Sequence, residues 1–445
     1  MTIQLPIREN ATPAEKQLAA LYSQNAESLP GADVPGVRAW RDAGITAFAE
    51  AGLPHRRIEE WKYTDLRTLL PQADDIANDM PEAPDFLMRE EPDVYRAVFI
   101  GGRFRADYST VQNAPGVTFR SLREALNDAA TAAEALARLP LAEYNAEHDS
   151  VTQLATAFAT DGAMLAVAPG IKLDKPLHLV FIAAGTAAEI HACRSALSLG
   201  EGADVSLVET HAGTGAAQMF TTLNLNIAGN ATLRHARLDE TPDARHLSAV
   251  VANLEAGAAY DPVHIVAGGA LTRAQNHITF NGEGARYNFN GAMLLKGREH
   301  ADFTQVVDHT VPSCESRETV KSVLDGESRG IFQAKVIVRP DAQKTDGRQL
   351  ANGLLLSETA EFDAKPELEI YADDVKCNHG ATSGALDEDM LFYLRSRGIP
   401  TDEAKSMLIL AFVGEIIDQI EDEAFREILM AKARDWLAKS GAGHS

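Results

Sequence analysis

The chain has 445 residues, of which 45% are apolar and 24% are charged, values that are ordinary for a globular protein with a large buried core. Its formal net charge of −23 argues against nucleic acid or an anionic membrane surface as the main partner, because both attract basic proteins. Three cysteines are too few for a disulfide framework. The first residues do not resemble a signal peptide, and the longest apolar stretch, 407–417, is too short to span a bilayer, so we expect a cytoplasmic protein.

The N-terminal region, 1–160, is predicted to be mainly helical. Thr12, Pro13 and Glu15 form a capping-box pattern at the start of a first helix, and a second helix over 33–51 ends at a Gly-Leu-Pro stop signal. The segment 71–93 is acidic and contains prolines, which predicts a loop. Two further helical patterns cover 122–139 and 151–159.

From about residue 163 the pattern changes to short segments of alternating apolar and polar residues, which predicts strands. They are 205–209, 222–227, 232–238, 246–254, 264–266, 277–280 and 303–307. Small-residue turns recur with spacings of 28, 27 and 27 residues at Ala203, Ala231, Ala258 and Ala285. A fixed period with two strands per unit and no intervening helix predicts a parallel β-helix with two main sheets over 161–375. The alternative is a large antiparallel sandwich in which the spacing is accidental.

The C-terminal region, 376–445, is predicted to be helical. One helix starts at Asp387 and ends before a Gly-Ile-Pro sequence, and Thr401 is expected to cap the next one. Apolar residues cover much of the circumference of this second helix, which predicts that it is buried or pairs with another chain. A solenoid has open ends that need covering, so we expect the helical flanks to cap them.

The sequence around Cys377 and His379 is the strongest candidate for chemistry. In a strand, these two residues point to the same face, so a thiol and an imidazole could converge on one metal ion or one partner group. The chain has no CxxC motif and therefore no local pattern for holding an iron–sulfur cluster by itself. One thiol and one imidazole are an incomplete ligand set, which predicts a site that is shared with a partner chain. The alternative is a buried structural thiol beside a turn histidine, with Asp373 and Asp374 as turn residues.

Other candidates are weaker. Isolated His/Asp pairs on a β-face, such as Asp308 with His309 and the segment 299–302, usually make structural hydrogen bonds, and Cys314 is a weak candidate for a catalytic thiol. The sequence contains no Walker A motif, no dinucleotide-binding glycine motif and no GxSxG elbow. We therefore expect that this chain binds no nucleotide and is not an enzyme.

Two competing functions remain open at this stage. The first is a β-helix carbohydrate-active enzyme in which Asp302, Asp308 or Asp373 supplies the acid and the base. An aromatic content of only 6% argues against this function, because carbohydrate sites usually present exposed aromatic rings. The second is a purely structural oligomerisation module, for which His379→Ala would leave function intact.

Several segments together resemble the SufB/SufD family of iron–sulfur cluster assembly scaffold subunits, and its SufD branch in particular. They are 57–64, 330–332, 344–347, 354–356, 365–382 and 391–399, and the block over 330–417 is highly specific. The most distinctive of them is the sequence Ile-Tyr-Ala-Asp-Asp-Val-Lys-Cys-Asn-His-Gly-Ala-Thr, residues 370–382.

The resemblance implies a right-handed parallel β-helix flanked by helical regions, and a non-catalytic scaffold that pairs with SufB through the ends of the β-helices. It implies that a nascent iron–sulfur cluster or iron is held transiently at that interface, where the interface histidine of the family falls on His379 and its neighbouring cysteine on Cys377. It further implies a role in iron acquisition and binding of the SufC ATPase through the C-terminal helices. The expected SufC contacts are Met407, Leu408, Phe412 and Ile416. An exposed end of the β-helix would also allow a homodimer when SufB is absent, but the sequence does not decide between the two states.

Overall fold

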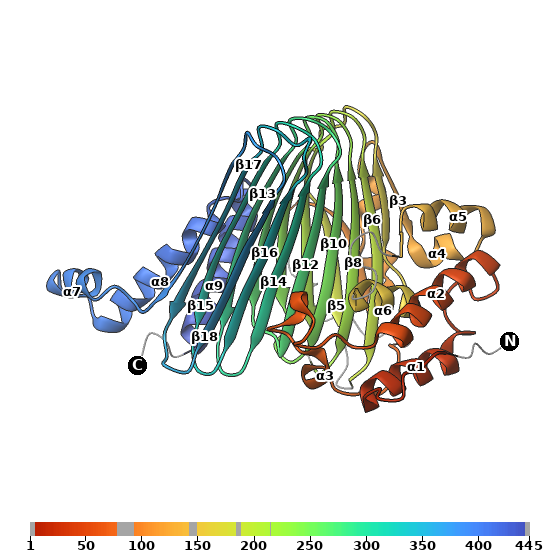
Figure 1. Cartoon of the computed structure of the whole chain (residues 1–445), viewed down its shortest axis with the longest axis horizontal. Coiled ribbons are helices and arrows are strands. Elements are labelled where there is room, and N and C mark those ends of the chain that lie inside the picture. The colour runs from red at the N-terminus through yellow and green to blue at the C-terminus, as the bar shows by residue number, and fades with distance from the viewer. Residues whose placement is uncertain (1–4, 78–92, 142–148, 184–187, 214, 441–445) are drawn as a thin grey trace.

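The computed structural model describes residues 5–77, 93–141, 149–183, 188–213 and 215–440. A parallel β-helix made of two facing sheets forms its centre, and helices lie on both sides of it (Figure 1). The predicted mainly-β fold, a parallel β-helix with N-terminal and C-terminal helical flanks, is confirmed.

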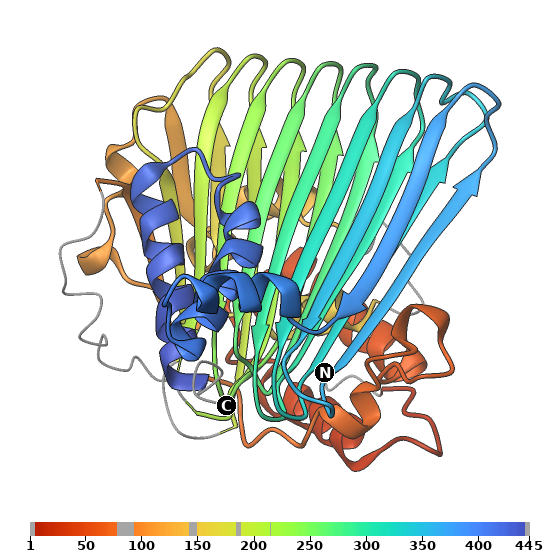
Figure 2. The same cartoon turned by 90° about the vertical axis from the view of Figure 1, so that its left-hand side faces the viewer.

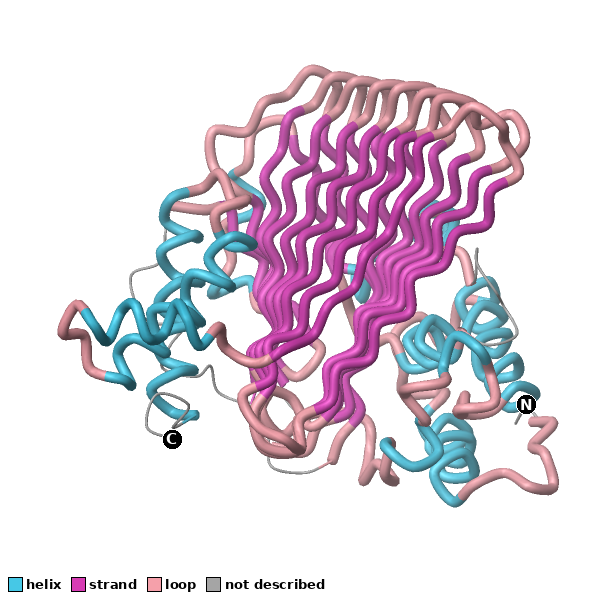
Figure 3. Tube along the Cα trace, turned by 60° about the vertical axis from the view of Figure 1, so that its left-hand side comes forward, coloured by secondary structure: helices cyan, strands magenta, loops and turns pink. Residues whose placement is uncertain are grey.

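Successive strands alternate between the two sheets, so that each coil contributes one strand to each sheet (Figure 3). The ten-stranded sheet has the order β19-β17-β15-β13-β11-β9-β7-β5-β1-β2, and the nine-stranded sheet has the order β18-β16-β14-β12-β10-β8-β6-β4-β3. Neighbours are parallel except for two antiparallel pairs at the N-terminal end, β1 with β2 and β3 with β4.

The strands in chain order are β1 (Tyr95–Ile100), β2 (Arg103–Phe104), β3 (Val117–Ser121), β4 (Ala163–Val167), β5 (Leu177–Ala183), β6 (Ile190–Leu199), β7 (Asp204–Gly213), β8 (Gln218–Ile227), β9 (Thr232–Glu240), β10 (Arg245–Leu254), β11 (Ala259–Ala267), β12 (Leu271–Phe280), β13 (Arg286–Leu295), β14 (His300–His309), β15 (Glu315–Leu324), β16 (Arg329–Val338), β17 (Asp346–Leu355), β18 (Glu361–Ile370) and β19 (Lys376–Gly384).

The repeat found in the sequence is the coil of the β-helix. Asp204 pairs with Thr232, Thr232 with Ala259, and Ala259 with Arg286, which are the same steps of 28, 27 and 27 residues. Each turn before these strands needs one residue with a positive φ, a conformation that glycine and asparagine adopt most readily. The four residues with φ of 67°, 56°, 67° and 72° are Gly202, Asn230, Gly257 and Gly284.

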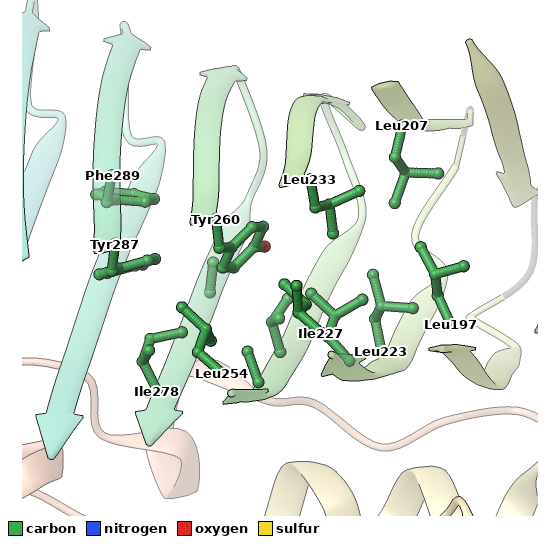
Figure 4. Close-up of a cluster of buried hydrophobic side chains, with 14 of the residues drawn as sticks. Leu197, Leu207, Leu223, Ile227, Leu233, Leu254, Tyr260, Ile278, Tyr287 and Phe289 are labelled. Atoms are coloured by element: carbon green, nitrogen blue, oxygen red, sulfur yellow. The ribbon is translucent and has the colours of Figure 1, made fainter. Parts of the chain in front are cut away.

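The space between the sheets, here called the lumen, is filled by side chains from both of them. Leucine, isoleucine and aromatic residues from successive coils stack above one another, as Figure 4 shows for part of this core. One column on the ten-stranded sheet runs through Val205, Leu233, Tyr260 and Tyr287, and the rings of Tyr260 and Tyr287 have centroids 5.6 Å apart. The lumen is therefore a packed core, and burial of these columns stabilises the coil.

The N-terminal helices cover the outer face of the nine-stranded sheet. They are α1 (Pro13–Asn25), α2 (Pro35–Ala51), α3 (Leu66–Leu69), α4 (Leu122–Leu126), α5 (Ala129–Ala137) and α6 (Ser150–Phe158), with short 3-10 turns at Glu59–Trp61, Ala106–Tyr108 and Val111–Asn113. The predicted capping box of α1 is present, with Thr12 and Glu15 bonded to each other's backbone N–H groups. The single helical pattern over 122–139 divides into α4 and α5, because the Asp128 side chain caps a new helix start.

The C-terminal helices are α7 (Glu388–Ser396), α8 (Thr401–Ile417) and α9 (Glu423–Ser440), and α8 and α9 lie across the outer face of the ten-stranded sheet (Figure 2). The expectation that the C-terminal helices cap the open end is wrong. Their apolar residues pack instead on outward-facing strand residues such as Val263, Ala292 and Val323, which offer a broad apolar surface. Thr401 is also not a cap: it is the first residue of α8, and Pro400 occupies the N-cap position.

The strands extend over a longer part of the chain than 161–375. The first begins at Tyr95, and β19 continues the β-helix to Gly384. The predicted boundary between 375 and 376 thus falls directly before a strand, and the domain limits stay a prediction. Among the described residues, none of the helices combines the length and the apolar character that a membrane crossing needs.

Candidate functional site

The C-terminal end of the β-helix is open. Within the described sheets, β18 and β19 are the last strands, and each has a neighbour on one side only, β16 and β17 respectively. Seven of the nine residues of β19 are exposed. Strand edges of this length present unpaired N–H and C=O groups, which are a template for pairing with another chain.

Cys377 and His379 lie on this edge strand and point to the same side. Cys377 is in register with Gly347 and His379 with Gln349 on β17. The Cys377 side chain is half-buried and packs on the lumen core, whereas His379 is exposed. Because alternate residues of a strand share a face, both side chains belong to the inner rim of the open end. Their role as metal ligands stays a prediction.

Burial raises the pKa of the Cys377 thiol, and the carboxyl groups of Asp346 and Glu318 add to the rise, while a backbone hydrogen bond from Gly347 partly opposes it. The thiol is therefore protonated at neutral pH in the isolated chain. A metal ion that binds Cys377 has to displace this proton, because the thiolate is the ligand. Cys193 and Cys314 are also free thiols, but both are buried far from this end in sequence.

Two buried polar side chains lie beneath His379 in the same column, Gln349 on β17 and Glu318 on β15. Neither carboxyl oxygen of Glu318 and neither amide atom of Gln349 has a well-aligned hydrogen-bond partner among the described residues. Burial raises the pKa of Glu318 to about 8, and the nearby Gln349 and Ser316 oppose the rise only in part. Sequence reasoning missed this pair, although the polar residues at inward positions of β15 and β17 were a signal.

Asp302 and Asp308, two of the three carboxylates of the carbohydrate-enzyme alternative, do not form an acid–base pair. Asp302 is buried in an ion pair with Arg273, and Asp308 binds Arg339 at 2.7 Å on the outer side. These two aspartates are six residues apart on one extended strand, about 20 Å, whereas an acid–base pair of a glycosidase needs about 5–10 Å. Asp373 is exposed in the turn before β19.

The histidines near these aspartates are structural in this chain. His309 faces the lumen and bonds to the Ser316 hydroxyl at 3.1 Å, and His300 bonds to the Thr64 hydroxyl at 3.1 Å. Both side chains are buried. The predicted structural hydrogen bonds are therefore present.

The segment around Trp61 fastens the N-terminal region to the last coils. The Arg273 guanidinium lies 3.8 Å from the centroid of the Trp61 ring and donates to the Glu60 carbonyl, and Gln333 donates to the same carbonyl at 3.2 Å. Lys365 on β18 forms an ion pair with Glu59. This segment therefore supports the outer face of the sheet that ends in β18.

The four predicted partner contacts on α8 have different environments. Met407 is 44% exposed, and Leu408 and Phe412 are half-buried. The Lys321 ammonium lies 4.6 Å from the centroid of the Phe412 ring. Ile416 is only 1% exposed and packs against the chain's own sheet, so it is not available to a partner in this structure.

A larger apolar surface lies on α7, which stands away from the β-helix (Figure 1). Met390, Phe392 and Tyr393 are 57%, 71% and 56% exposed, and the helix contains no buried residue. Large exposed apolar side chains at adjacent positions are typical of interaction surfaces. The sequence pattern did not single out this helix as an interaction surface. Its apolar residues could equally have been covered by another part of the chain, and only the structure shows that they are exposed.

Together, the fold and its open end define a two-sheet β-helix protein that leaves one strand edge, with a thiol and an imidazole, accessible. The sequence matches two family models, the SUF system FeS cluster assembly SufBD core domain over residues 181–412 and the SufBD protein N-terminal region over 12–84 and 88–179. The chain belongs to the SufB/SufD family of iron–sulfur cluster assembly proteins.

Its relatives agree with this assignment. The chain is 33% identical over 397 residues to the iron–sulfur cluster assembly protein SufD of Escherichia coli, which covers 87% of this chain and 90% of the relative. It is 30% identical over 426 residues to a SufBD family protein of Synechocystis sp., with 92% of each chain covered. SufD of Bacillus subtilis is 29% identical over 160 residues, which is 36% of this chain and 37% of the relative.

Proposed function

We propose that this chain is a non-catalytic scaffold subunit that assembles an iron–sulfur cluster together with a SufB subunit, in the cytoplasm. The observation that carries the proposal is the unpaired edge strand β19, which holds an exposed His379 and a half-buried Cys377 on one face. A partner strand that extends the sheet buries this edge and brings its own side chains to the rim.

A shared site fits the number of ligands that one chain offers. Iron–sulfur clusters are generally held by four thiolates or imidazoles, and this rim supplies one of each. The carboxyl of Glu318 and the amide of Gln349 lie deeper in the same column and can orient the rim residues through hydrogen bonds once the end is covered. The partner then supplies the remaining ligands, and iron enters at this end before the cluster is complete.

The C-terminal helices are the proposed docking surface for the SufC ATPase, which would supply the nucleotide chemistry of the complex. Met407 is the exposed member of the expected contacts on α8, and the apolar residues of α7 enlarge the surface. We leave Ile416 out of this surface because it is buried against the β-helix. In the absence of SufB, the same open end pairs with a second copy of this chain.

The test is anaerobic co-expression with the cognate SufB and SufC, followed by affinity purification and measurement of stoichiometry, iron and sulfide. His379→Ala is compared with Asn378→Ala, a matched control because Asn378 is also exposed on β19 but points to the opposite face. We expect all three proteins to form the complex and only His379→Ala to lose the cluster. Failure of the wild-type chain to bind SufB would refute the scaffold proposal, and normal cluster content in His379→Ala would remove His379 from the site.

A further inference from the structure

A second group of metal-ligand residues lies in the middle of the β-helix, away from the open end. The group consists of buried polar side chains from β7, β9, β10 and β11, which are 0–5% exposed: Glu209, His211, His235, Arg237, Asp239, His246 and His264. They face the lumen, because the alternate residues Val208, Leu238 and Leu247 pack on the outer faces of the two sheets. We call this group the lumen cluster.

Three members of the lumen cluster have the geometry of a metal site. One ligand atom each from His211, Asp239 and His246 lies within 4.8 Å of the other two. The rings of His211 and His246 have centroids 4.4 Å apart, and His246 Nδ1 lies 2.6 Å from Asp239 Oδ1. Two imidazoles and one carboxylate are a ligand set that suits divalent iron, cobalt and zinc.

Neighbouring groups hold these three side chains in place. His211 Nε2 donates to the Glu209 carboxylate, Asp239 accepts further hydrogen bonds from Arg237 and His264, and the Thr221 hydroxyl bonds to His246 Nε2 at 2.7 Å. Carboxylates and hydroxyls that bond to the second nitrogen of a ligating imidazole commonly orient it toward a metal. When Asp239 and the Nδ1 atom of His246 bind one ion, the imidazole carries its proton on Nε2, and this N–H donates a hydrogen bond to the Thr221 hydroxyl oxygen.

The lumen cluster also contains polar atoms whose hydrogen bonding among the described residues is incomplete. His211 Nδ1 has no hydrogen-bond partner among the described residues, and the second oxygen of Glu209 has only a poorly aligned contact, at 3.3 Å, with His235 Nε2, although both side chains are buried. With neutral imidazoles, the formal charge of Glu209, Asp239 and Arg237 sums to −1. A buried, incompletely balanced negative charge is costly, and a bound cation offsets that cost.

We propose that His211, Asp239 and His246 bind a divalent transition-metal ion inside the β-helix lumen, with Glu209 as the group that orients His211. This site is independent of the rim residues Cys377 and His379. Because the cluster is closed to solvent, the ion binds while the chain folds, and it stabilises the coils that supply its ligands.

The test uses the full chain expressed in medium supplemented with Co²⁺, then desalted and analysed for cobalt by mass spectrometry and for Co²⁺ ligand-field absorption. Wild type is compared with His211→Gln and His246→Gln. His309→Gln is the matched control, because His309 is also a buried lumen imidazole but, among the residues that the structure describes, its one hydrogen bond is to Ser316. Far-UV circular dichroism and the thermal midpoint establish that each variant is folded.

We expect about one cobalt ion per chain in the wild type and in His309→Gln, and at least a tenfold loss in the two ligand variants. An anomalous difference peak between His211, Asp239 and His246 in a cobalt-loaded crystal of the wild type decides the case even where a variant fails to fold. Cobalt-free wild-type protein, or cobalt that is undiminished in His246→Gln, would overturn the proposal. Cobalt that is lost from His379→Ala instead would place the ion at the open end and overturn the proposal.

Discussion

Replacing Glu318 by glutamine should stabilise this protein, and by an amount that depends on pH. Glu318 is fully buried on β15, and burial raises its pKa from 4.5 to about 8. The folded state therefore holds the Glu318 proton more tightly than the unfolded state does. The contribution of Glu318 to the free energy of unfolding is therefore fully present below about pH 4.5. It is lost as the pH rises toward 8 and does not change further above that value. Glutamine has nearly the same size and carries no charge, so it removes this dependence.

The structure sets the magnitude. Each unit of pKa corresponds to about 1.4 kcal/mol, so a shift from 4.5 to about 8 costs the folded state up to about 5 kcal/mol once the carboxyl is ionised. Between about pH 5 and about pH 9, we expect the free energy of unfolding of the wild type to fall by about 4 kcal/mol relative to Glu318→Gln.

Urea unfolding of both proteins at several pH values measures this difference, and titrations common to both proteins cancel in it. Glu327→Gln is the control, because the Glu327 side chain is 65% exposed, and its difference should stay within about 0.5 kcal/mol at every pH. A wild-type minus Glu318→Gln difference that does not change with pH would refute the reasoning, since it would mean that Glu318 is ionised in the folded state at no cost.

Three further outcomes are expected. Arg273→Ala leaves the buried Asp302 without its ion pair and should lower the free energy of unfolding by about 3–5 kcal/mol in urea at neutral pH; a loss under about 1 kcal/mol would contradict the assigned pairing. Gly291→Ala places a Cβ 2.8 Å from a phenylalanine ring in the lumen and should cost about 1–3 kcal/mol, measured by the same unfolding assay. Ile416→Asp should prevent stable folding. Met407→Asp should leave the thermal midpoint unchanged and weaken SufC binding in a pull-down. Equal effects of the two changes would show that the buried and exposed faces of α8 are assigned wrongly.

The repeat was predictable because it is written in local sequence. Each coil needs a turn residue that tolerates positive φ, followed by a small buried residue, and such residues recur at the coil length around Ala203, Ala231 and Ala258. The strand alternation that follows each turn separates lumen-facing from outward-facing residues. The same rule predicts that Cys377 and His379 share one face of β19.

Positions of the helices were less predictable. The sequence shows that α8 is apolar over most of its circumference, and this property fits an end cap, a partner contact or a covered sheet face equally well. The outward-facing residues of the ten-stranded sheet decide between them, since they offer an apolar surface that α8 and α9 cover. For that reason the buried Ile416 and the exposed Met407 could not be told apart from sequence.

The lumen cluster was also predictable from the sequence only in part. His211 and Asp239 are 28 residues apart and pair directly across β7 and β9, so the period alone could have placed them side by side. His246 comes from the opposite sheet, and no sequence spacing indicates that it meets them across the lumen.

Thus, the sequence by itself determined the coil length, the strand faces and the common face of Cys377 and His379, because these depend on the backbone period and on alternation along one strand. Only the tertiary structure decided which end stays open, which outer face the helices cover and which buried polar residues meet. Those outcomes depend on contacts between sheets and helices that are distant in sequence, where packing of apolar surface and pairing of buried charge, rather than local preference, select the arrangement.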